Sequence, residues 1–169
     1  FGNQYFYLQR QLVALSIGLF AGTIFLFVPI SFYRENGLLL ILISAFLLSL
    51  VFIPGIGVEK NGSLRWINIG FNIQPSEIAK IFVPIYLCGY CLKRKDQLEN
   101  SWWGFIKPLI LTSIISILLL LEMDLGATVV IFAIGILILF IGGAKFNQLL
   151  ILFLVFISIV ILIAYFNEE

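Results

Sequence analysis

The chain contains 169 residues, of which 62% are hydrophobic and 11% are charged. Soluble domains average about 45–50% apolar and about 25% charged residues, so this composition excludes a soluble globular domain and also a disordered chain. The net charge of +1 provides no basic footprint for nucleic acid, which we exclude as a partner. The sequence has no histidine, so catalytic or metal sites that need this residue are excluded. We therefore expect a membrane protein with no evident cofactor.

Apolar stretches of about 20 residues, the length that a helix needs to cross a bilayer, recur along the chain. Six transmembrane helices are predicted, at residues 11–30, 37–54, 76–92, 105–122, 125–142 and 147–166. Turns or helix boundaries are predicted at Asn36-Gly37, Pro108 and Gly142-Gly143. The predicted fold class is all-α, a polytopic bundle of membrane helices that forms a single membrane domain over residues 1–169.

Two cysteines, Cys88 and Cys91, have the CxxC spacing of redox and zinc sites. They lie near the end of an apolar stretch, and the sequence offers neither a third cysteine nor a histidine to complete a metal site. We interpret them as small residues inside a membrane helix.

Lysine and arginine gather between the third and fourth predicted spans, at Lys93, Arg94, Lys95 and Lys107. By the positive-inside rule, loop 93–104 is predicted to be cytoplasmic, with Arg34 and Lys145 on the same side. Alternation then makes loop 55–75 extracytoplasmic. This long connection combines glycine and asparagine with aliphatic and aromatic residues, so we expect a functional segment that lies in the membrane interface.

Charges within a predicted span are costly, and Glu77 and Lys80 are the main example. Their i,i+3 spacing places them on one helical face, where they can pair. Pro75 and Ser76 suit the first turn of that helix. Two compatible interpretations remain: a salt bridge that orients the helix, or a polar cavity that opens to the outer leaflet.

The predicted outer side offers two further candidates. Arg65-Trp66 could hold a lipid-linked phosphate, or could anchor the loop at the interface without a substrate. Asp124 is predicted to cap the following helix, while Glu122 and Asp124 together could perform acid–base chemistry or hold a divalent cation. A transporter, a lipid-handling enzyme and a scaffold all fit these features.

Several segments resemble the SEDS family (FtsW/RodA/SpoVE) of membrane polymerases. The segments are FYLQRQL at 6–12, IPGIGVEKNGSLRWINIG at 53–70, QPSEIAK at 74–80, MDLGA at 123–127 and LFIGGAK at 139–145. The last segment resembles the cell-division, FtsW-like branch more than the rod-elongation branch. Glu122-Met123 and Ala127 depart from the family's corner motif, which has Gln-Pro and Thr at these positions.

The resemblance implies roles for particular residues. Substrate or cavity residues would be Arg65, Trp66, Gln74, Ser76, Glu77 and Lys80, and structural or accessory residues would be Pro75, Asp124 and Gly126. The resemblance starts at the family's second helix and stops before the outer loop with its essential aspartate. We therefore expect an internal fragment with no catalytic residue of its own.

The resemblance also implies a function, peptidoglycan glycosyl transfer for septal cell-wall synthesis in cell division. The substrates would be lipid II and the undecaprenyl-diphosphate-linked glycan. The partners would be a class B penicillin-binding protein and other membrane proteins of the division complex. The protein would be located in the bacterial cytoplasmic membrane at the septum. A lipid II flippase and a truncated, non-catalytic membrane protein remain as alternatives.

Overall fold

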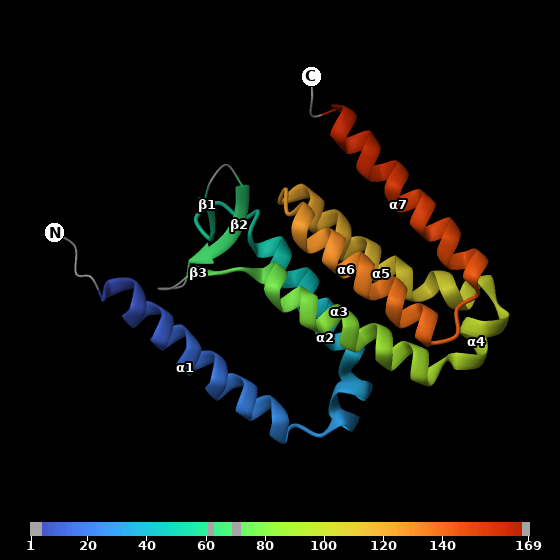
Figure 1. Cartoon of the computed structure of the whole chain (residues 1–169), viewed down its shortest axis with the longest axis horizontal. Coiled ribbons are helices and arrows are strands. Elements are labelled where there is room, and N and C mark those ends of the chain that lie inside the picture. The colour runs from blue at the N-terminus through green and yellow to red at the C-terminus, as the bar shows by residue number, and fades with distance from the viewer. Residues whose placement is uncertain (1–4, 61–62, 69–71, 167–169) are drawn as a thin grey trace. The chain divides into compact units, whose positions relative to one another are not determined.

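The computed structural model describes residues 5–60, 63–68 and 72–166 (Figure 1). The chain divides into two compact units, Phe1–Tyr33 and Arg34–Glu169, which are described separately. Helix α2, Ile30–Leu50, begins in the first unit and continues into the second.

The first unit is built around helix α1, Phe6–Phe27. The prediction of a helix over 11–30 is wrong at its end, because the residue before a proline is driven out of the helical region. Val28 precedes Pro29 and is extended, with φ −77° and ψ 123°. The Tyr33 hydroxyl donates a hydrogen bond to the Phe25 carbonyl oxygen at 3.1 Å, which ties the start of α2 to the end of α1.

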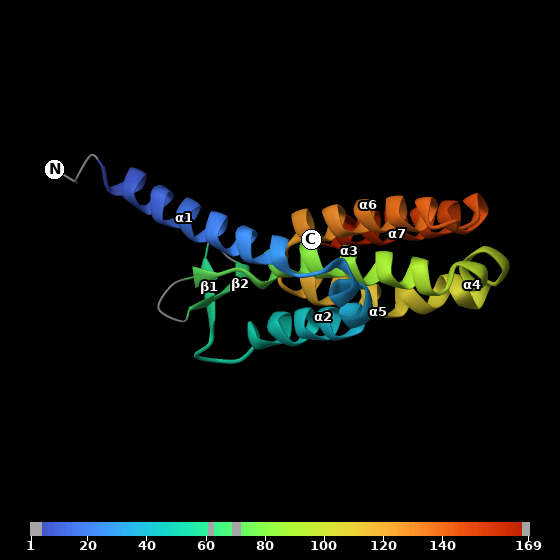
Figure 2. The same cartoon turned by 90° about the horizontal axis from the view of Figure 1, so that it is seen from below.

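The second unit contains most of the helices. After α2 come α3 (Pro75–Lys93), α4 (Lys95–Asn100), α5 (Trp102–Leu121), α6 (Leu125–Ile141) and α7 (Phe146–Phe166). Each predicted span thus overlaps a long helix, although α2 begins and ends earlier than the predicted span 37–54, and the all-α bundle is confirmed. Helices α3, α5 and α6 lie side by side in both views (Figures 1 and 2). Cys88 and Cys91 lie within α3, as expected for residues of a helix, and are free thiols.

Two of the three predicted boundaries are wrong because tertiary contacts decide the local structure. Gly37 lies inside α2, where a Cβ would come within 3.1 Å of the Tyr86 Cα, so this glycine allows two helices to approach closely. Pro108 lies inside α5 and cannot donate to the carbonyl oxygen four residues earlier. That oxygen, on Gly104, accepts from the Tyr90 hydroxyl at 2.7 Å instead. The third boundary is confirmed, since α6 ends at Gly142-Gly143.

A three-stranded antiparallel sheet occupies the segment that was predicted to lie in the membrane interface. Its strands are β1 (Gly57–Lys60), β2 (Ser63–Asn68) and β3 (Asn72–Ile73), in the order β1-β2-β3. Ser63 and Ile67 of β2 are buried, so the central strand packs inward. Ile69 and Phe71, which contributed to the interfacial prediction, lie outside the described residues.

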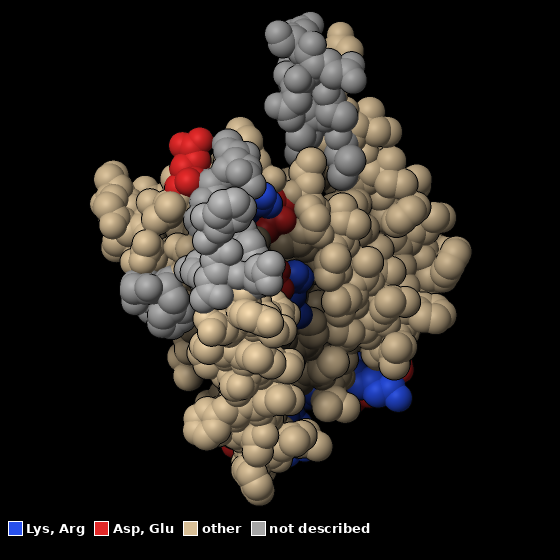
Figure 3. All heavy atoms as spheres, turned by 60° about the vertical axis from the view of Figure 1, so that its left-hand side comes forward, with Lys and Arg blue, Asp and Glu red and all other residues tan. Residues whose placement is uncertain are grey.

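The core of the second unit lies where α3 packs against α5 and α6. Its fully buried side chains include Ala79, Leu87, Leu119 and Leu139. Large apolar side chains also cover the outside of the long helices, for example Ile141 and Leu92, and the face shown in Figure 3 is mostly uncharged. An apolar exterior of this extent is what a bilayer-facing surface requires.

The helices differ in whether their length and apolar composition suffice to cross a bilayer. Among the described residues, α2 and α5 are each long and apolar enough to cross a bilayer. Gln11–Phe27, Leu125–Ile141 and Phe146–Ile159 are shorter apolar helices. That six helices cross the membrane therefore stays a prediction.

Candidate functional site

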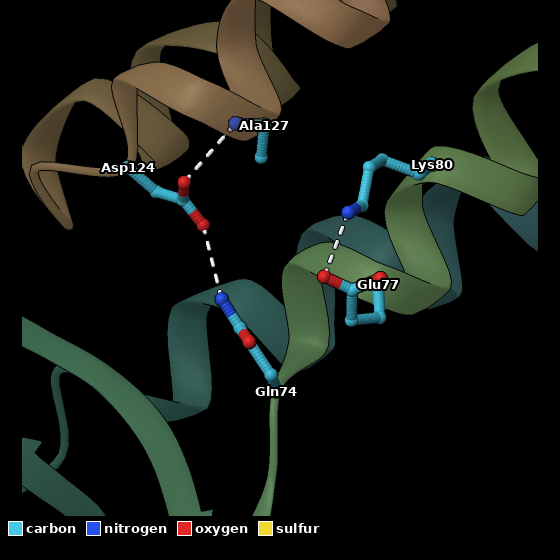
Figure 4. A network of polar contacts seen from close by, with 5 residues as sticks. All are labelled: Gln74, Glu77, Lys80, Asp124 and Ala127. Atoms are coloured by element: carbon cyan, nitrogen blue, oxygen red, sulfur yellow. Dashed lines mark hydrogen bonds and ion pairs between the residues drawn. The ribbon is translucent and has the colours of Figure 1, made fainter.

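A cluster of polar side chains lies where α3 and α6 begin (Figure 4). Helix α3 starts at Pro75, which fits the first turn because its missing N–H would have no helical partner there. One turn later the Lys80 ammonium donates to Glu77 Oε1 at 2.7 Å. The predicted pairing of these two charges is therefore confirmed, and the pair neutralises both within α3.

Asp124 connects the start of α6 to the residue that precedes α3. Its Oδ1 accepts from the Ala127 backbone N–H at 3.0 Å, so the predicted N-cap is confirmed. Its Oδ2 accepts from Gln74 Nε2 at 3.2 Å, although the two residues are 50 positions apart. Because Asp124 is only 6% exposed, these two hydrogen bonds fix the corner between α5 and α6 against α3.

Glu122, at the same corner, is the residue that sequence reasoning undervalued. It is 1% exposed, and neither carboxylate oxygen has a hydrogen-bond partner within the described part of the chain. Burial, and secondarily the negative charge of Asp124, raise the pKa of Glu122 to about 8. The available signal was its departure from the family motif, which has glutamine there. The side chain is therefore protonated at neutral pH and is a poor partner for a cation.

The sheet side of the cluster presents Arg65 and Trp66 on β2, which contacts α3. Arg65 is half-buried, and its Nε has no hydrogen-bond partner among the described atoms. Ser76 is fully buried, and its hydroxyl likewise lacks a described partner. Gly126 lies in the first turn of α6, beside the Asp124 carboxylate. The structure thus joins Gln74 to Asp124 by a hydrogen bond, and among the described atoms no hydrogen bond joins Arg65 to either residue.

No group of three or more His, Cys, Asp or Glu side chains capable of holding a metal ion occurs in the described ranges. The Glu122 and Asp124 carboxylates are too few, and too well explained by burial and capping, to define a metal centre on their own.

Known proteins resemble this chain along nearly its whole length. Residues 1–168 match the FTSW_RODA_SPOVE family model, described as "Cell cycle protein". The "Probable peptidoglycan glycosyltransferase FtsW" of Pseudomonas fluorescens (strain SBW25) is 47% identical over 143 residues, covering 84% of this chain and 35% of the relative. The protein with that name in Marinomonas mediterranea is 44% identical over 159 residues, covering 94% and 37%.

Two solved structures share the fold. The crystal structure of Thermus thermophilus RodA, a rod shape determining protein, aligns with a TM-score of 0.76 at 29% identity, covering 89% of this chain and 50% of that one. A chain of a peptidoglycan synthase complex, described for its coordination of polymerization and crosslinking, aligns with a TM-score of 0.77 at 28% identity, covering 96% and 47%. This chain therefore spans half or less of the proteins it matches.

Proposed function

This chain belongs to the FtsW/RodA/SpoVE family of cell cycle proteins, and we propose that it forms part of a membrane peptidoglycan glycosyltransferase of the cell-division type. The observation that carries this proposal is the paired cluster of Gln74, Glu77, Lys80 and Asp124 at the ends of apolar helices. Relatives up to 47% identical that are named as peptidoglycan glycosyltransferases support the same reaction.

The proposed reaction joins two lipid-linked sugars. A base accepts the proton of an acceptor sugar hydroxyl on lipid II, and that oxygen attacks the anomeric carbon of the growing strand. The bond to undecaprenyl diphosphate breaks, and the diphosphate leaves with the electron pair. We assign the base to no residue of this chain. Arg65 is the candidate contact for the leaving diphosphate, since its Nε is buried and has no partner among the described atoms.

The cluster at the start of α3 would shape the cavity that holds the sugars. Asp124 and Gln74 hold the corner in place, and the Glu77–Lys80 pair presents two opposite charges that sum to zero. Preorganised polar groups of this kind orient substrates without moving during the reaction. Trp66 and Ser76 would complete the wall, with Pro75 and Gly126 as structural supports.

The proposal extends to location and partners. We place the chain in the bacterial cytoplasmic membrane at the septum, with loop 55–75 outside and loop 93–104 in the cytoplasm. The proposed partners are a class B penicillin-binding protein and other division proteins, and a divalent cation could neutralise the diphosphate.

A chimera tests the function. This chain would replace the matching segment of Pseudomonas fluorescens FtsW, and the purified chimera would be given lipid II. Glycan strands, separated by gel electrophoresis, are the expected product. Glu77→Gln combined with Lys80→Met should reduce strand synthesis at least about tenfold, the scale of a substrate-positioning contact. Unchanged synthesis would remove the cavity role.

A matched control comes from α4, where Lys95 and Glu99 form an ion pair with an N–O distance of 3.7 Å. Lys95→Met combined with Glu99→Gln deletes the same chemical groups away from the proposed cavity and should leave synthesis near the unsubstituted chimera. Lipid II translocation across vesicles without any glycan strands would favour a flippase. Sequencing the DNA beyond Glu169 tests the third alternative, the truncated protein.

A further inference from the structure

A basic pocket lies at the other end of α3, away from the sheet. It has a volume of about 260 Å³ and is formed by residues of α2, α3, α4 and α5. Four cationic side chains line it, those of Arg34, Lys93, Arg94 and Lys107, together with one carboxylate, that of Glu35. The lining therefore carries three positive charges in excess. Nothing in the proposed polymerase reaction uses this pocket.

Close helix packing builds the floor of the pocket. A Cβ on Gly89 would come within 3.2 Å of the Arg34 carbonyl oxygen, so the glycine lets the backbone of α3 approach that of α2. Gly37 does the same from the opposite helix. The Tyr90 hydroxyl, bonded to the Gly104 carbonyl oxygen, ties α3 to the start of α5. These contacts hold the cationic side chains around one cavity.

Among the described residues, no carboxylate forms an ion pair with a cation of the pocket. In the part of the chain that the structure describes, ion pairs join Lys80 to Glu77 and Lys95 to Glu99, and neither involves a pocket cation. The Lys93 ammonium donates a hydrogen bond to the Glu35 backbone carbonyl oxygen at 3.4 Å. It forms no ion pair with the Glu35 carboxylate. A cavity lined by cations without counter-charges is suited to an anion with several oxygen acceptors.

We propose that this pocket binds the phosphate-bearing headgroup of an anionic phospholipid. Arg34 and Arg94 offer planar donor forks and Lys93 and Lys107 offer point charges, the two kinds of group that bind phosphate oxygens. Basic pockets between membrane helices recognise such headgroups. The site is independent of the proposed glycosyl transfer.

The surroundings favour a lipid over a free phosphate. Leu38 lines the pocket and is 55% exposed, so apolar surface continues from the cavity along the outside of α2. Acyl chains can lie on that surface while the phosphate enters the pocket. Trp102 and Trp103, at the start of α5, are both exposed, as expected for side chains at the level of lipid headgroups. By the positive-inside rule the headgroup would come from the cytoplasmic leaflet.

Native mass spectrometry of the purified 169-residue chain in detergent tests the site. The chain would be titrated with phosphatidylglycerol and, separately, with zwitterionic phosphatidylcholine. We expect selective phosphatidylglycerol adducts. Arg34→Gln combined with Lys107→Gln should weaken phosphatidylglycerol binding roughly tenfold and leave phosphatidylcholine binding unchanged.

The matched control is Lys95→Gln combined with Lys145→Gln, which removes two exposed cations that do not line the pocket. It should retain the affinity of the unsubstituted chain. Equal weakening by both double variants would overturn the proposal, because binding would then follow net charge alone. Circular dichroism would verify that both variants fold. Full displacement of phosphatidylglycerol by millimolar inorganic phosphate would also overturn it, in favour of a free-phosphate site.

Discussion

Helix α3 has a polar region at each end, and the two regions differ in whether their charged side chains are paired. At its start, Lys80 pairs with Glu77, and Gln74 and Asp124 are hydrogen-bonded to each other. At its end, the cations of the basic pocket have no carboxylate partner among the described residues. In the first region the charges of Glu77 and Lys80 are thus balanced within the chain, and in the second the cations remain available to an anion from outside. A paired cluster suits the positioning of substrates, whereas an unpaired one suits the recognition of a lipid.

A tightly packed glycine lies in the sheet that precedes α3 and another lies near the basic pocket, and substitutions there should have the largest effects. A Cβ at Gly57 would overlap the Val51 carbonyl oxygen near the sheet, and one at Gly104 would overlap the Gln97 carbonyl oxygen near the basic pocket. Because backbone atoms cannot move aside cheaply, Gly57→Ala and Gly104→Ala should each lower the free energy of unfolding by about 3 kcal/mol or more. Thermal unfolding in detergent measures this.

The control is Gly18→Ala in α1, where nothing lies within 4 Å of the added Cβ. It should leave the unfolding temperature unchanged or slightly raised, because alanine favours helix over glycine. If Gly104→Ala proved as mild as the control, the tight approach that supports the pocket wall would be wrong.

Near the start of α3, Glu122 differs from the paired side chains because its carboxylate oxygens have no described hydrogen-bond partner. Its substitution should have the next largest effect on stability. Its pKa of about 8 exceeds the ordinary value of 4.5, so folding favours the protonated form. Its contribution to stability is therefore complete below about pH 4.5 and is lost as the pH rises toward 8. Glu122→Gln stays neutral at every pH, and its free energy of unfolding should exceed that of the native chain by up to about 4 kcal/mol at pH 8.

The measurement is a series of unfolding curves between pH 4.5 and 8.5. The native chain should lose stability across this range, and Glu122→Gln should flatten the curve. Glu99→Gln, which removes a partly exposed carboxylate, serves as the control for the loss of one negative charge. Parallel slopes for Glu122→Gln and the native chain would show that Glu122 is ionised when buried.

Local rules predicted the features that depend on neighbouring residues. The apolar stretches located the six long helices, and the spacing of Glu77 and Lys80 predicted their contact. The position of Asp124 before Leu125 predicted a helix cap, because a carboxylate there reaches the free N–H groups of the first turn.

Features that depend on distant parts of the chain escaped prediction. The Gln74–Asp124 bond joins residues 50 positions apart, and no local pattern encodes it. The sheet within the expected interfacial segment also escaped prediction, because its strands satisfy one another's backbone groups, a pairing that hydrophobic content alone does not reveal. Pro108 lies inside a helix, where the Tyr90 hydroxyl donates to the Gly104 carbonyl oxygen the hydrogen bond that the proline cannot.

Substitutions of Asp124 test whether the polar cluster at the start of α3 also stabilises the fold. Asp124→Ala removes the cap at the Ala127 N–H and the acceptor for Gln74, and should lower the free energy of unfolding by about 1–2 kcal/mol. Asp124→Asn keeps an oxygen for the cap and should cost about half as much. Chemical unfolding of the two variants side by side measures the difference, and equal losses would mean that the cap contributes nothing.

The Glu77–Lys80 pair should have the smallest effect on stability although it lies at the centre of the proposed cavity. Its side chains are 60% and 28% exposed, and exposed ion pairs contribute little because water and salt screen them. Lys80→Met should therefore change the free energy of unfolding by less than about 0.5 kcal/mol, as should Lys95→Met at the start of α4. The two variants should differ in glycan synthesis by the chimera, which Lys80→Met should reduce and Lys95→Met should leave unchanged. A loss of stability that matches the loss of synthesis would make Lys80 a residue that holds the fold, and the paired end would then have no role in positioning substrate.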